Sequence, residues 1–133
     1  MAKILVIDDD PEMRSALEQT LTLAGHDVML AEDGEQGLKL LRDQPANLVI
    51  TDIFMPNKEG FETINTLRKD FPGVPIIAIS GRPELGNVLA IARRLGSVRT
   101  LAKPFQSPEL LVAVEETLQA KPGGSAKRNG GQP

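Results

Sequence analysis

The 133-residue sequence contains no cysteine, no tryptophan and no tyrosine, and it has only four phenylalanines. Without cysteine the chain forms neither disulfide bonds nor thiolate metal sites, so a reducing compartment suits it. The shortage of aromatic rings removes the stacking platforms on which proteins hold single-stranded nucleic acids. Stability must therefore come from an apolar core, which a chain of this length is able to bury.

Long hydrophobic runs are absent as well. The first apolar stretch covers residues 4–7, which is too short for a secretion signal, and no later stretch approaches the length of a membrane span. The net charge is −3, and it becomes −6 when the three basic residues within positions 121–133 are set aside. An acidic domain without a basic stripe is poorly suited to DNA or RNA. We expect a cytoplasmic protein whose partners include neither nucleic acid nor membrane.

Short apolar runs alternate with amphipathic stretches along the chain. A continuous run such as residues 4–7 is typical of a strand buried on both faces. Apolar residues at helical spacing predict the helices, with Asp10 as the N-cap of the first and Gly25 at its end. Ala24 is expected on its apolar face, and Leu111, Val114 and Leu118 on that of the last helix. The predicted strands cover residues 4–7, 28–31, 48–51, 75–79 and 98–102, and the predicted helices begin near residues 11, 34, 59, 84 and 108.

This alternation with short connections predicts an α/β fold, in which a parallel sheet is covered by helices on both faces. We expect one domain over residues 1–120. Residues 121–133 are rich in glycine and proline and nearly lack apolar side chains, so they are predicted to form a flexible tail.

Acidic residues stand where two of the strands end. Asp8 and Asp9 follow the first strand, and Asp52 follows the third. The carboxyl ends of parallel strands share one edge of the sheet, where ligands bind. Carboxylates gathered there favour a hard cation such as Mg²⁺, and a carboxylate beside that cation is able to attack phosphorus. The alternative for each aspartate is an ordinary solvated loop, cap or turn residue.

Two further strand ends carry side chains suited to a phosphoryl group. Lys103 follows the fifth strand and precedes Pro104, where a cis peptide bond would aim the lysine over the same edge. Ser80 ends the fourth strand and offers a hydroxyl group to a phosphoryl oxygen. Taken singly, Lys103 also fits an ordinary surface lysine, and Ser80 also fits a residue that starts a turn.

The ordered set resembles the receiver domain of two-component response regulators over roughly residues 2–120. That family places an acidic pair after the first strand, the phosphoacceptor aspartate after the third, Ser or Thr after the fourth, and Lys-Pro after the fifth. The matching residues here are Asp8-Asp9, Asp52, Ser80 and Lys103-Pro104. The resemblance implies a flavodoxin-like (βα)5 doubly wound sheet of strand order 2-1-3-4-5, an order for which a receiver is one of the standard examples.

The resemblance also implies roles for these residues. Asp9, Asp52 and the main-chain carbonyl of Phe54 would bind Mg²⁺, with Asp8 acting mainly through water on the ion. Asp52 would be phosphorylated by the phosphohistidine of a sensor histidine kinase or a histidine phosphotransfer protein. Lys103 would contact the phosphoryl group and Ser80 would move toward it. Such a domain catalyses its own phosphorylation and dephosphorylation and is not otherwise an enzyme.

The sequence departs from the family pattern at Thr100, where receivers commonly carry an aromatic switch residue. We therefore expect the segment 81–92, with its proline and glycines, to be mobile and to transmit the signal. A second hypothesis is that Phe54 slows loss of the phosphoryl group. Arg93, Arg94 and Arg99 form either a cationic patch or an ordinary solvated face. With no output domain in this sequence, the resemblance is to stand-alone members that act on a downstream protein.

Two other interpretations remain at this stage. Asp8 and Asp10 have the spacing of the two catalytic aspartates in haloacid-dehalogenase-type phosphatases, which would make the protein an enzyme. Alternatively, the chain is an interaction module that keeps the fold without being phosphorylated. Turnover of phosphomonoesters would distinguish the first, and partner binding that is indifferent to a phosphodonor would distinguish the second.

Overall fold

The computed structural model describes residues 2–53, 59–80 and 99–120, with the backbone alone for residues 59–61, 80 and 120. Its strands are β1 (Lys3–Ile7), β2 (Asp27–Ala31), β3 (Leu48–Asp52), β4 (Ile76–Ser80) and β5 (Arg99–Ala102). Its helices are α1 (Pro11–Leu23), α2 (Gly34–Asp43), α3 (Glu59–Asp70) and α5 (Ser107–Ala120). The predicted helix near residues 84–95 and the predicted tail at 121–133 lie outside the described residues.

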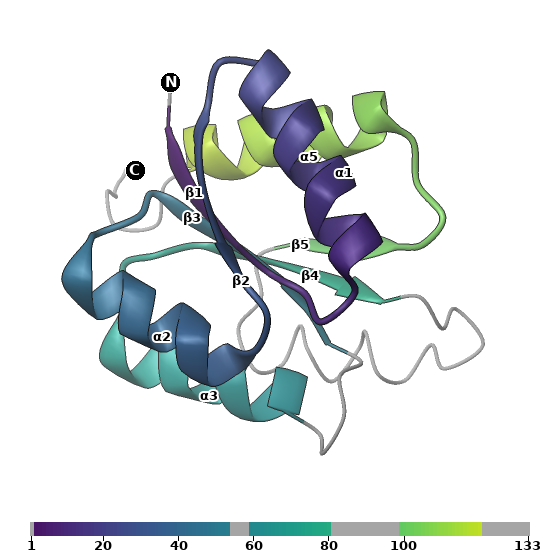
Figure 1. Ribbon diagram of the computed structural model, residues 1–133. Helices are drawn as coiled ribbons and strands as arrows, with labels where there is room; N and C mark the ends of the chain where they lie inside the picture. The colour runs from purple at the N-terminus through teal and green to yellow at the C-terminus, as the bar shows by residue number, and fades with distance from the viewer. Residues whose placement is uncertain (1, 54–58, 81–98, 121–133) are drawn as a thin grey trace.

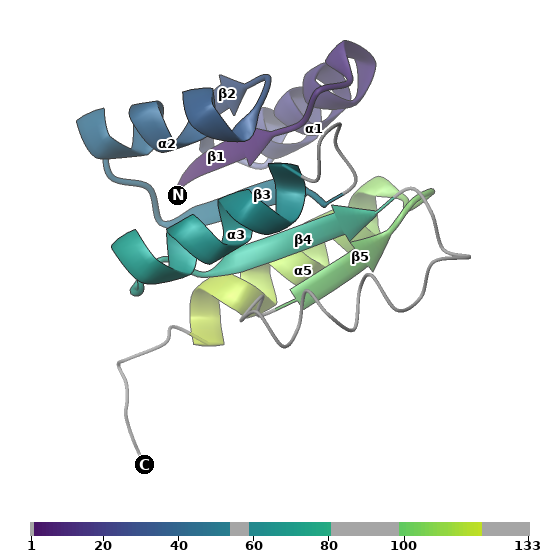
Figure 2. The same cartoon turned by 90° about the horizontal axis from the view of Figure 1, so that it is seen from below.

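The five strands form one parallel sheet in the order β2-β1-β3-β4-β5. Helices α1 and α5 cover one face, and α2 and α3 cover the other (Figures 1 and 2). The predicted flavodoxin-like architecture is confirmed. The strand order follows from crossover connections, which place β1 and β3 side by side at the centre although α1, β2 and α2 separate them in sequence.

Each central strand serves two hydrophobic cores. Leu5 and Ile7 of β1 pack in the core under α2 and α3, whereas Ile4 and Val6 pack in the core under α1 and α5. Successive side chains of a strand point to opposite faces of the sheet, so one apolar run supplies both layers. All four side chains are fully buried, which anchors the end of β1 rigidly.

The expected ends of α1 are confirmed. The Asp10 side chain accepts a hydrogen bond from the backbone N–H of Glu12, and Pro11 is the first helical residue. Gly25 has a φ of 97°, a conformation that favours glycine at the end of a helix. Ala24, predicted on the apolar face, is instead an exposed residue beyond the last turn.

The predicted apolar positions of α5 all face the core. Val114 is fully buried, and Leu111 and Leu118 are half-buried and pack against the same core. The fully buried residues of α5 are spaced three, one and three positions apart, as on one face of a helix: Leu110, Ala113, Val114 and Thr117. The polar Thr117 shares this buried face, which the apolar spacing alone did not predict.

None of the described helices combines the length and the apolar character that a membrane crossing needs.

Gly37 allows α2 to lie directly on the end of β1. A Cβ atom added at this glycine would stand 2.5 Å from Cδ1 and 2.8 Å from Cγ1 of the buried Ile7. Such overpacking costs about 1–3 kcal/mol, and the better helix propensity of alanine offsets about 1 kcal/mol of it. We expect Gly37→Ala to lower the free energy of unfolding by up to about 2 kcal/mol, measured by urea unfolding with circular dichroism.

Gly73→Ala is the matched control, because no atom lies within 4 Å of the added Cβ at that position. Its effect should stay within about 0.5 kcal/mol. Equal destabilisation by the two substitutions would contradict a close contact between α2 and β1.

Candidate phosphoacceptor and metal site

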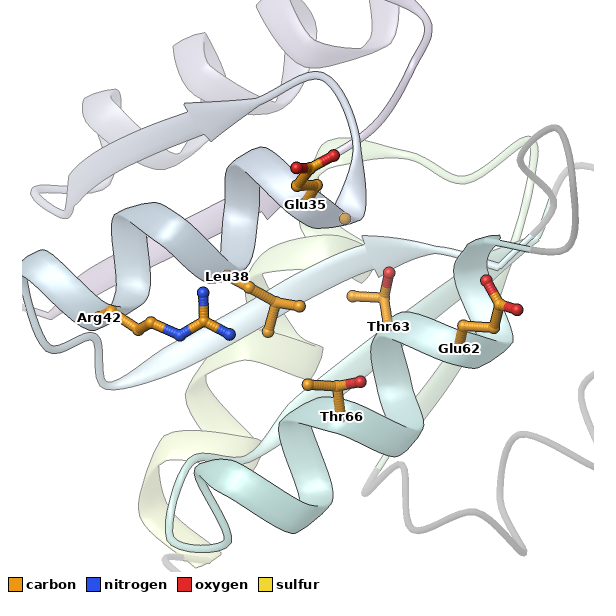
Figure 3. A pocket seen from close by; sticks show the side chains of 7 residues that line it. Glu35, Leu38, Arg42, Glu62, Thr63 and Thr66 are labelled. Carbon is orange, nitrogen blue, oxygen red and sulfur yellow. The ribbon is translucent and has the colours of Figure 1, made fainter.

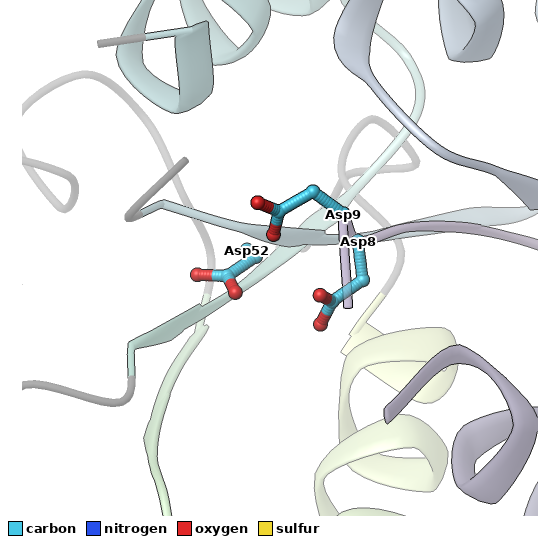
Figure 4. Close-up of side chains that lie close together, drawn as sticks. All are labelled: Asp8, Asp9 and Asp52. Carbon is cyan, nitrogen blue, oxygen red and sulfur yellow. The ribbon is translucent and has the colours of Figure 1, made fainter. Parts of the chain in front are cut away.

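Three aspartates meet at the carboxyl edge of the sheet because β1 and β3 are neighbours. Asp8 and Asp9 follow β1, and Asp52 is the last residue of β3, not the first residue after it as predicted. One carboxylate oxygen from each lies within 4.8 Å of the other two (Figure 4). Asp8 and Asp52 are buried and Asp9 is exposed. Among the residues that the structure describes, this is the one cluster of three acidic or imidazole side chains able to share a metal ion.

Lys103, which follows β5, reaches the same cluster. Its Nζ donates a hydrogen bond to Asp52 Oδ2 at 3.1 Å and forms an ion pair with Asp8 Oδ2 at 3.5 Å. The peptide bond between Lys103 and Pro104 is cis, the conformation that the sequence analysis considered as a way to aim the lysine at this edge. Residues 8, 52 and 103, which come from three separate strands, thus form a single charged group.

Asp8 is the most strongly held member of the cluster. Its backbone N–H donates to the carbonyl of Ala31 at 3.1 Å, and its Oδ1 accepts from the backbone N–H of Asp10 at 2.9 Å. Burial raises the pKa of the Asp8 carboxyl from 3.8 to about 6, and the nearby Asp52 charge adds to this rise. The hydrogen bond from Asp10 and the charge of Lys103 oppose the rise without cancelling it.

The pKa of Lys103 is shifted by the same surroundings. Burial alone lowers the pKa of an ammonium group, but attraction to Asp52 and to Asp8 outweighs burial and leaves the Lys103 pKa raised. The lysine is therefore positively charged at neutral pH. One cation faces three carboxyl groups, which leaves the site with an excess of negative charge.

The residues of the cluster fit Mg²⁺. Every side-chain ligand is a carboxylate oxygen, the donor type that hard cations prefer. Asp8 Oδ2 is buried and accepts no hydrogen bond from the described residues, and Lys103, which it faces at 3.5 Å, is shared with Asp52, so a second cation would compensate the remaining buried charge. An oxygen in this state beside two other carboxylates suits a small divalent ion.

The other residues singled out in the sequence have mixed outcomes. Asp10 caps α1 and takes no part in the cluster, which removes the second acid that a haloacid-dehalogenase-type site requires. Ser80 ends β4 one residue beyond Ile79, the register partner of Asp52; its side chain is not described. Phe54 and the segment 81–92 lie outside the described residues, so the hypotheses about them stay predictions. Thr100 is a half-buried residue of β5.

Of the three arginines of the proposed cationic patch, only Arg99 is described. Its guanidinium group pairs with Glu116 of α5, so at least this arginine is neutralised within the domain.

Arg14 is a residue of the site that the sequence prediction missed. Its guanidinium Nη1 donates to the main-chain carbonyl oxygen of Asp8 at 2.7 Å. A signal for it does exist in the sequence. Positive charge is unfavourable near a helix N-terminus because of the helix dipole, and Arg14 is the fourth residue of α1.

Apart from the aspartate cluster, a hollow lies between α2 and α3, with a volume of about 220 Å³ (Figure 3). Glu35 and Arg42 line its two ends on α2, about 10 Å apart for seven helical residues, and Glu62 faces it from α3. Its charged groups are spread along the groove and do not converge on a point. We therefore assign the chemistry to the aspartate cluster.

Comparison with protein families identifies the class. The family model described as the response regulator receiver domain matches residues 4–115. The chain belongs to this family, whose members are phosphoacceptor signalling domains and generally bind Mg²⁺ and interact with kinases or phosphotransfer proteins. The membership of the receiver family that the five site residues predicted is confirmed. The interpretation of the chain as a haloacid-dehalogenase-type phosphatase is wrong.

Two curated relatives are about twice as long as the segment that they share with this chain. The transcriptional regulatory protein CpxR of Escherichia coli K12 is 37% identical over 130 residues, which cover 97% of this chain and 54% of CpxR. The transcriptional regulatory protein AfsQ1 of Streptomyces coelicolor is 35% identical over 119 residues, covering 90% of this chain and 52% of AfsQ1. The chain thus spans about half the length of these relatives.

Solved structures agree with the fold. A CheY-like receiver domain protein from Methanospirillum hungatei has a TM-score of 0.84 at 28% identity, over 90% of this chain and 95% of that chain. The receiver domain of NtrX from Brucella abortus has a TM-score of 0.84 at 28% identity, over 89% of this chain and 99% of that chain. Both likenesses extend across nearly the whole of a receiver domain.

Proposed function

We propose that this domain accepts a phosphoryl group on Asp52 from a phosphohistidine donor in a Mg²⁺-dependent step. The observation that supports this most directly is the convergence of Asp8, Asp9, Asp52 and Lys103 at one edge of the sheet. The donor would be a sensor histidine kinase or a histidine phosphotransfer protein, and the output a changed contact with a downstream protein.

In the proposed transfer, an oxygen of the Asp52 carboxylate forms a bond to phosphorus while the bond from phosphorus to the donor imidazole nitrogen breaks. The imidazole leaves with the bonding electron pair and takes up a proton. Lys103 Nζ, already 3.1 Å from Asp52 Oδ2, is placed to compensate the charge on a phosphoryl oxygen. Mg²⁺ held by Asp9, Asp52 and the Phe54 carbonyl would supply further positive charge to the transferring oxygens.

Asp8 and Ser80 have supporting roles in this proposal. Asp8 adds negative charge beside the cation through its buried carboxylate, and it holds the following loop through its hydrogen bond with the Asp10 N–H. Ser80, at the end of the neighbouring strand β4, offers its hydroxyl group to the phosphoryl oxygen. Movement of the β4–α5 side of the domain would then report the modification.

The test is intact-mass measurement after incubation with acetyl phosphate and Mg²⁺. We expect one phosphoryl adduct on the wild-type protein, none with EDTA, and none on Asp52→Asn. Asp43→Asn, at an exposed aspartate ending α2, is the control and should be modified as fully as the wild type. An adduct of equal size on Asp52→Asn would contradict the assignment of the acceptor.

The absence of any adduct calls for a second probe, because rapid hydrolysis hides a short-lived product. Beryllofluoride with Mg²⁺ mimics the phosphoryl group on a carboxylate and does not depend on its lifetime. Failure of the wild-type protein to bind beryllofluoride as well would favour the interaction module that keeps the fold without being phosphorylated.

The partners, the domain organisation and the cellular location expected for this protein stay predictions. The relatives that share the domain are named transcriptional regulators, and this chain matches about half of their length. The expectation that the 133 residues themselves contact no nucleic acid, the stand-alone organisation, the domain limits at 1–120 and the cytoplasmic setting are therefore proposals.

A further inference from the structure

The peptide unit between Asp8 and Asp9 joins two acids of the cluster, and its orientation controls the second of them. A peptide group is planar, so the direction of the Asp8 carbonyl also sets where the chain enters Asp9. Arg14 Nη1 donates to this carbonyl oxygen at 2.7 Å from the first turns of α1. The guanidinium group is a charged donor, which makes the hydrogen bond stronger than one from a neutral donor.

The neighbouring peptide units are held by other groups. The Asp8 N–H pairs with Ala31, and the Asp10 N–H donates to Asp8 Oδ1 at 2.9 Å. The Asp10 carbonyl accepts the backbone N–H of Arg14 at 2.9 Å. The peptide units before and after the Asp8–Asp9 unit are thus each hydrogen-bonded. The carbonyl oxygen of the Asp8–Asp9 unit itself accepts its hydrogen bond from the Arg14 side chain.

Asp9 depends on this backbone more than the other acids do. Its side chain is exposed and makes no hydrogen bond or ion pair within the described part of the chain. Asp8 is buried and bonded, and Asp52 is bonded to Lys103. The carboxylate of Asp9 therefore stays within 4.8 Å of the other two only as far as its own backbone is fixed.

We infer that Arg14 is a positioning residue for the metal site, acting through the Asp8–Asp9 peptide to hold the Asp9 carboxylate at the cation position. This rests on the proposed function in so far as it takes the cluster to bind Mg²⁺. Arg14 itself contacts neither the metal nor the phosphoryl group in this inference. Groups that orient metal ligands in this way commonly change metal affinity 10-fold or more when removed.

Because Arg14 is positively charged, an orienting role and a purely electrostatic effect predict opposite changes in Mg²⁺ affinity when its guanidinium group is removed. Removing a positive charge close to a cation site strengthens cation binding by Coulomb's law. Removing a group that orients a ligand weakens it. Arg14→Met keeps most of the apolar stem and deletes the guanidinium group, so the direction of its effect decides between the two.

The experiment is a Mg²⁺ titration of the isolated protein followed by amide NMR shifts, with no phosphodonor present. We expect Arg14→Met to weaken Mg²⁺ binding on the order of 10-fold and to shift the amide signals of Asp9 and Asp10 before any metal is added. Arg14→Lys, which keeps the charge and a donor, should recover part of the affinity. Arg42→Met is the matched control at an exposed arginine of α2 and should bind as the wild type does.

A double-variant comparison tests the route through Asp9. In an Asp9→Asn background, Arg14→Met should cause no further loss of Mg²⁺ affinity, because the ligand that it positions is already gone. An additional loss of the full size would overturn the assignment to Asp9. Circular dichroism of each metal-free variant shows that the fold is retained at the titration temperature.

Three outcomes would overturn the inference. Arg14→Met that binds Mg²⁺ as tightly as the wild type, or more tightly, contradicts a positioning role. A loss shared equally by Arg42→Met also contradicts it, since that residue is remote from the site. A wild-type protein that does not bind Mg²⁺ removes the proposed metal site itself, and this separates failure of the proposed function from failure of the role of Arg14.

Discussion

Replacing Lys103 by methionine is expected to lower the free energy of unfolding at pH 7 by about 3 kcal/mol and to slow phosphoryl uptake on the order of 100-fold. The reason for the first effect is burial. The Asp8 side chain is 1% exposed and that of Asp52 6% exposed, and Lys103 Nζ is the cation that faces both. Removing one partner of a buried pair leaves an uncompensated charge, which is among the costliest single changes.

The second effect concerns the charge that develops on the phosphoryl oxygens. A donor held in advance at 3.1 Å from Asp52 needs no reorganisation when the phosphoryl group arrives. Methionine keeps the length of the stem and removes only the ammonium group. Loss of rate with Mg²⁺ affinity retained would separate this role of Lys103 from a role in metal binding.

The destabilisation caused by Lys103→Met is expected to depend on pH. Because the pKa of Asp8 is about 6 in the presence of Lys103, and Lys103 lowers it, removal of Lys103 raises it further. Acidification then protonates Asp8 and relieves the cost, so the destabilisation by Lys103→Met should be largest above pH 6 and should shrink toward pH 4.

Urea unfolding with circular dichroism measures the stability change, and intact mass against time measures the uptake. Lys39→Met, at an exposed lysine of α2, removes the same charge far from the cluster and serves as the control. A loss of stability that does not vary between pH 4 and pH 7 would contradict the buried charge cluster as its cause.

The second large effect is a gain of stability. In the absence of Mg²⁺, Asp8→Asn is expected to stabilise the protein at pH 7 by up to about 3 kcal/mol. Asparagine has the shape of aspartate and keeps an oxygen that accepts the Asp10 N–H. It removes a charge that is buried beside Asp52, and burial is the main reason for the raised pKa of Asp8.

The raised pKa determines how this gain varies with pH. The pKa of the Asp8 carboxyl rises from 3.8 to about 6 on folding, so the folded state binds the proton more tightly than the unfolded state. This group therefore contributes stability in full below pH 3.8, and the contribution is lost as the pH rises to about 6. A pKa rise of this size corresponds to a free energy of about 3 kcal/mol.

The measurement compares the free energy of unfolding of wild type and Asp8→Asn with EDTA from pH 4 to pH 7. The two proteins should be similar at pH 4, where Asp8 is protonated, and should diverge by pH 7. Saturating Mg²⁺ should narrow the difference at pH 7, because the cation compensates the carboxylate only in the wild type. A difference that is the same at every pH would show that Asp8 is not the titrating group.

The strands and most helix limits were predictable because local chemistry sets them. The apolar run of β1, the Asp10 cap and Gly25 after α1 act within a few residues of their own positions. The burial of Thr117 on α5 was not predictable in the same way. Thr117 is buried although its hydroxyl group has no hydrogen-bond partner among the described residues, so its place on the buried face follows from the packing of α5 and not from local chemistry.

The same distinction between local chemistry and tertiary contacts applies to the residues of the site. Asp8, Asp52 and Lys103 were predictable because each stands at the end of an apolar strand, and parallel strands end at one edge. For Arg14 the sequence offers only an unfavourable positive charge near the start of a helix, and its partner, a main-chain carbonyl six residues earlier, is known only from the structure. The close approach at Gly37 likewise exists only where α2 meets Ile7.

The sequence by itself determined the parallel α/β class, the order of chemically active strand ends and the resemblance to a receiver domain, because periodicity, capping and strand-end residues are properties of short segments. The tertiary structure decided that three carboxyl groups and one ammonium group share a site, that the pKa of Asp8 rises to about 6, and that Arg14 holds the Asp8–Asp9 peptide. Burial and distance between remote residues set these properties, and both come into existence only when the sheet assembles.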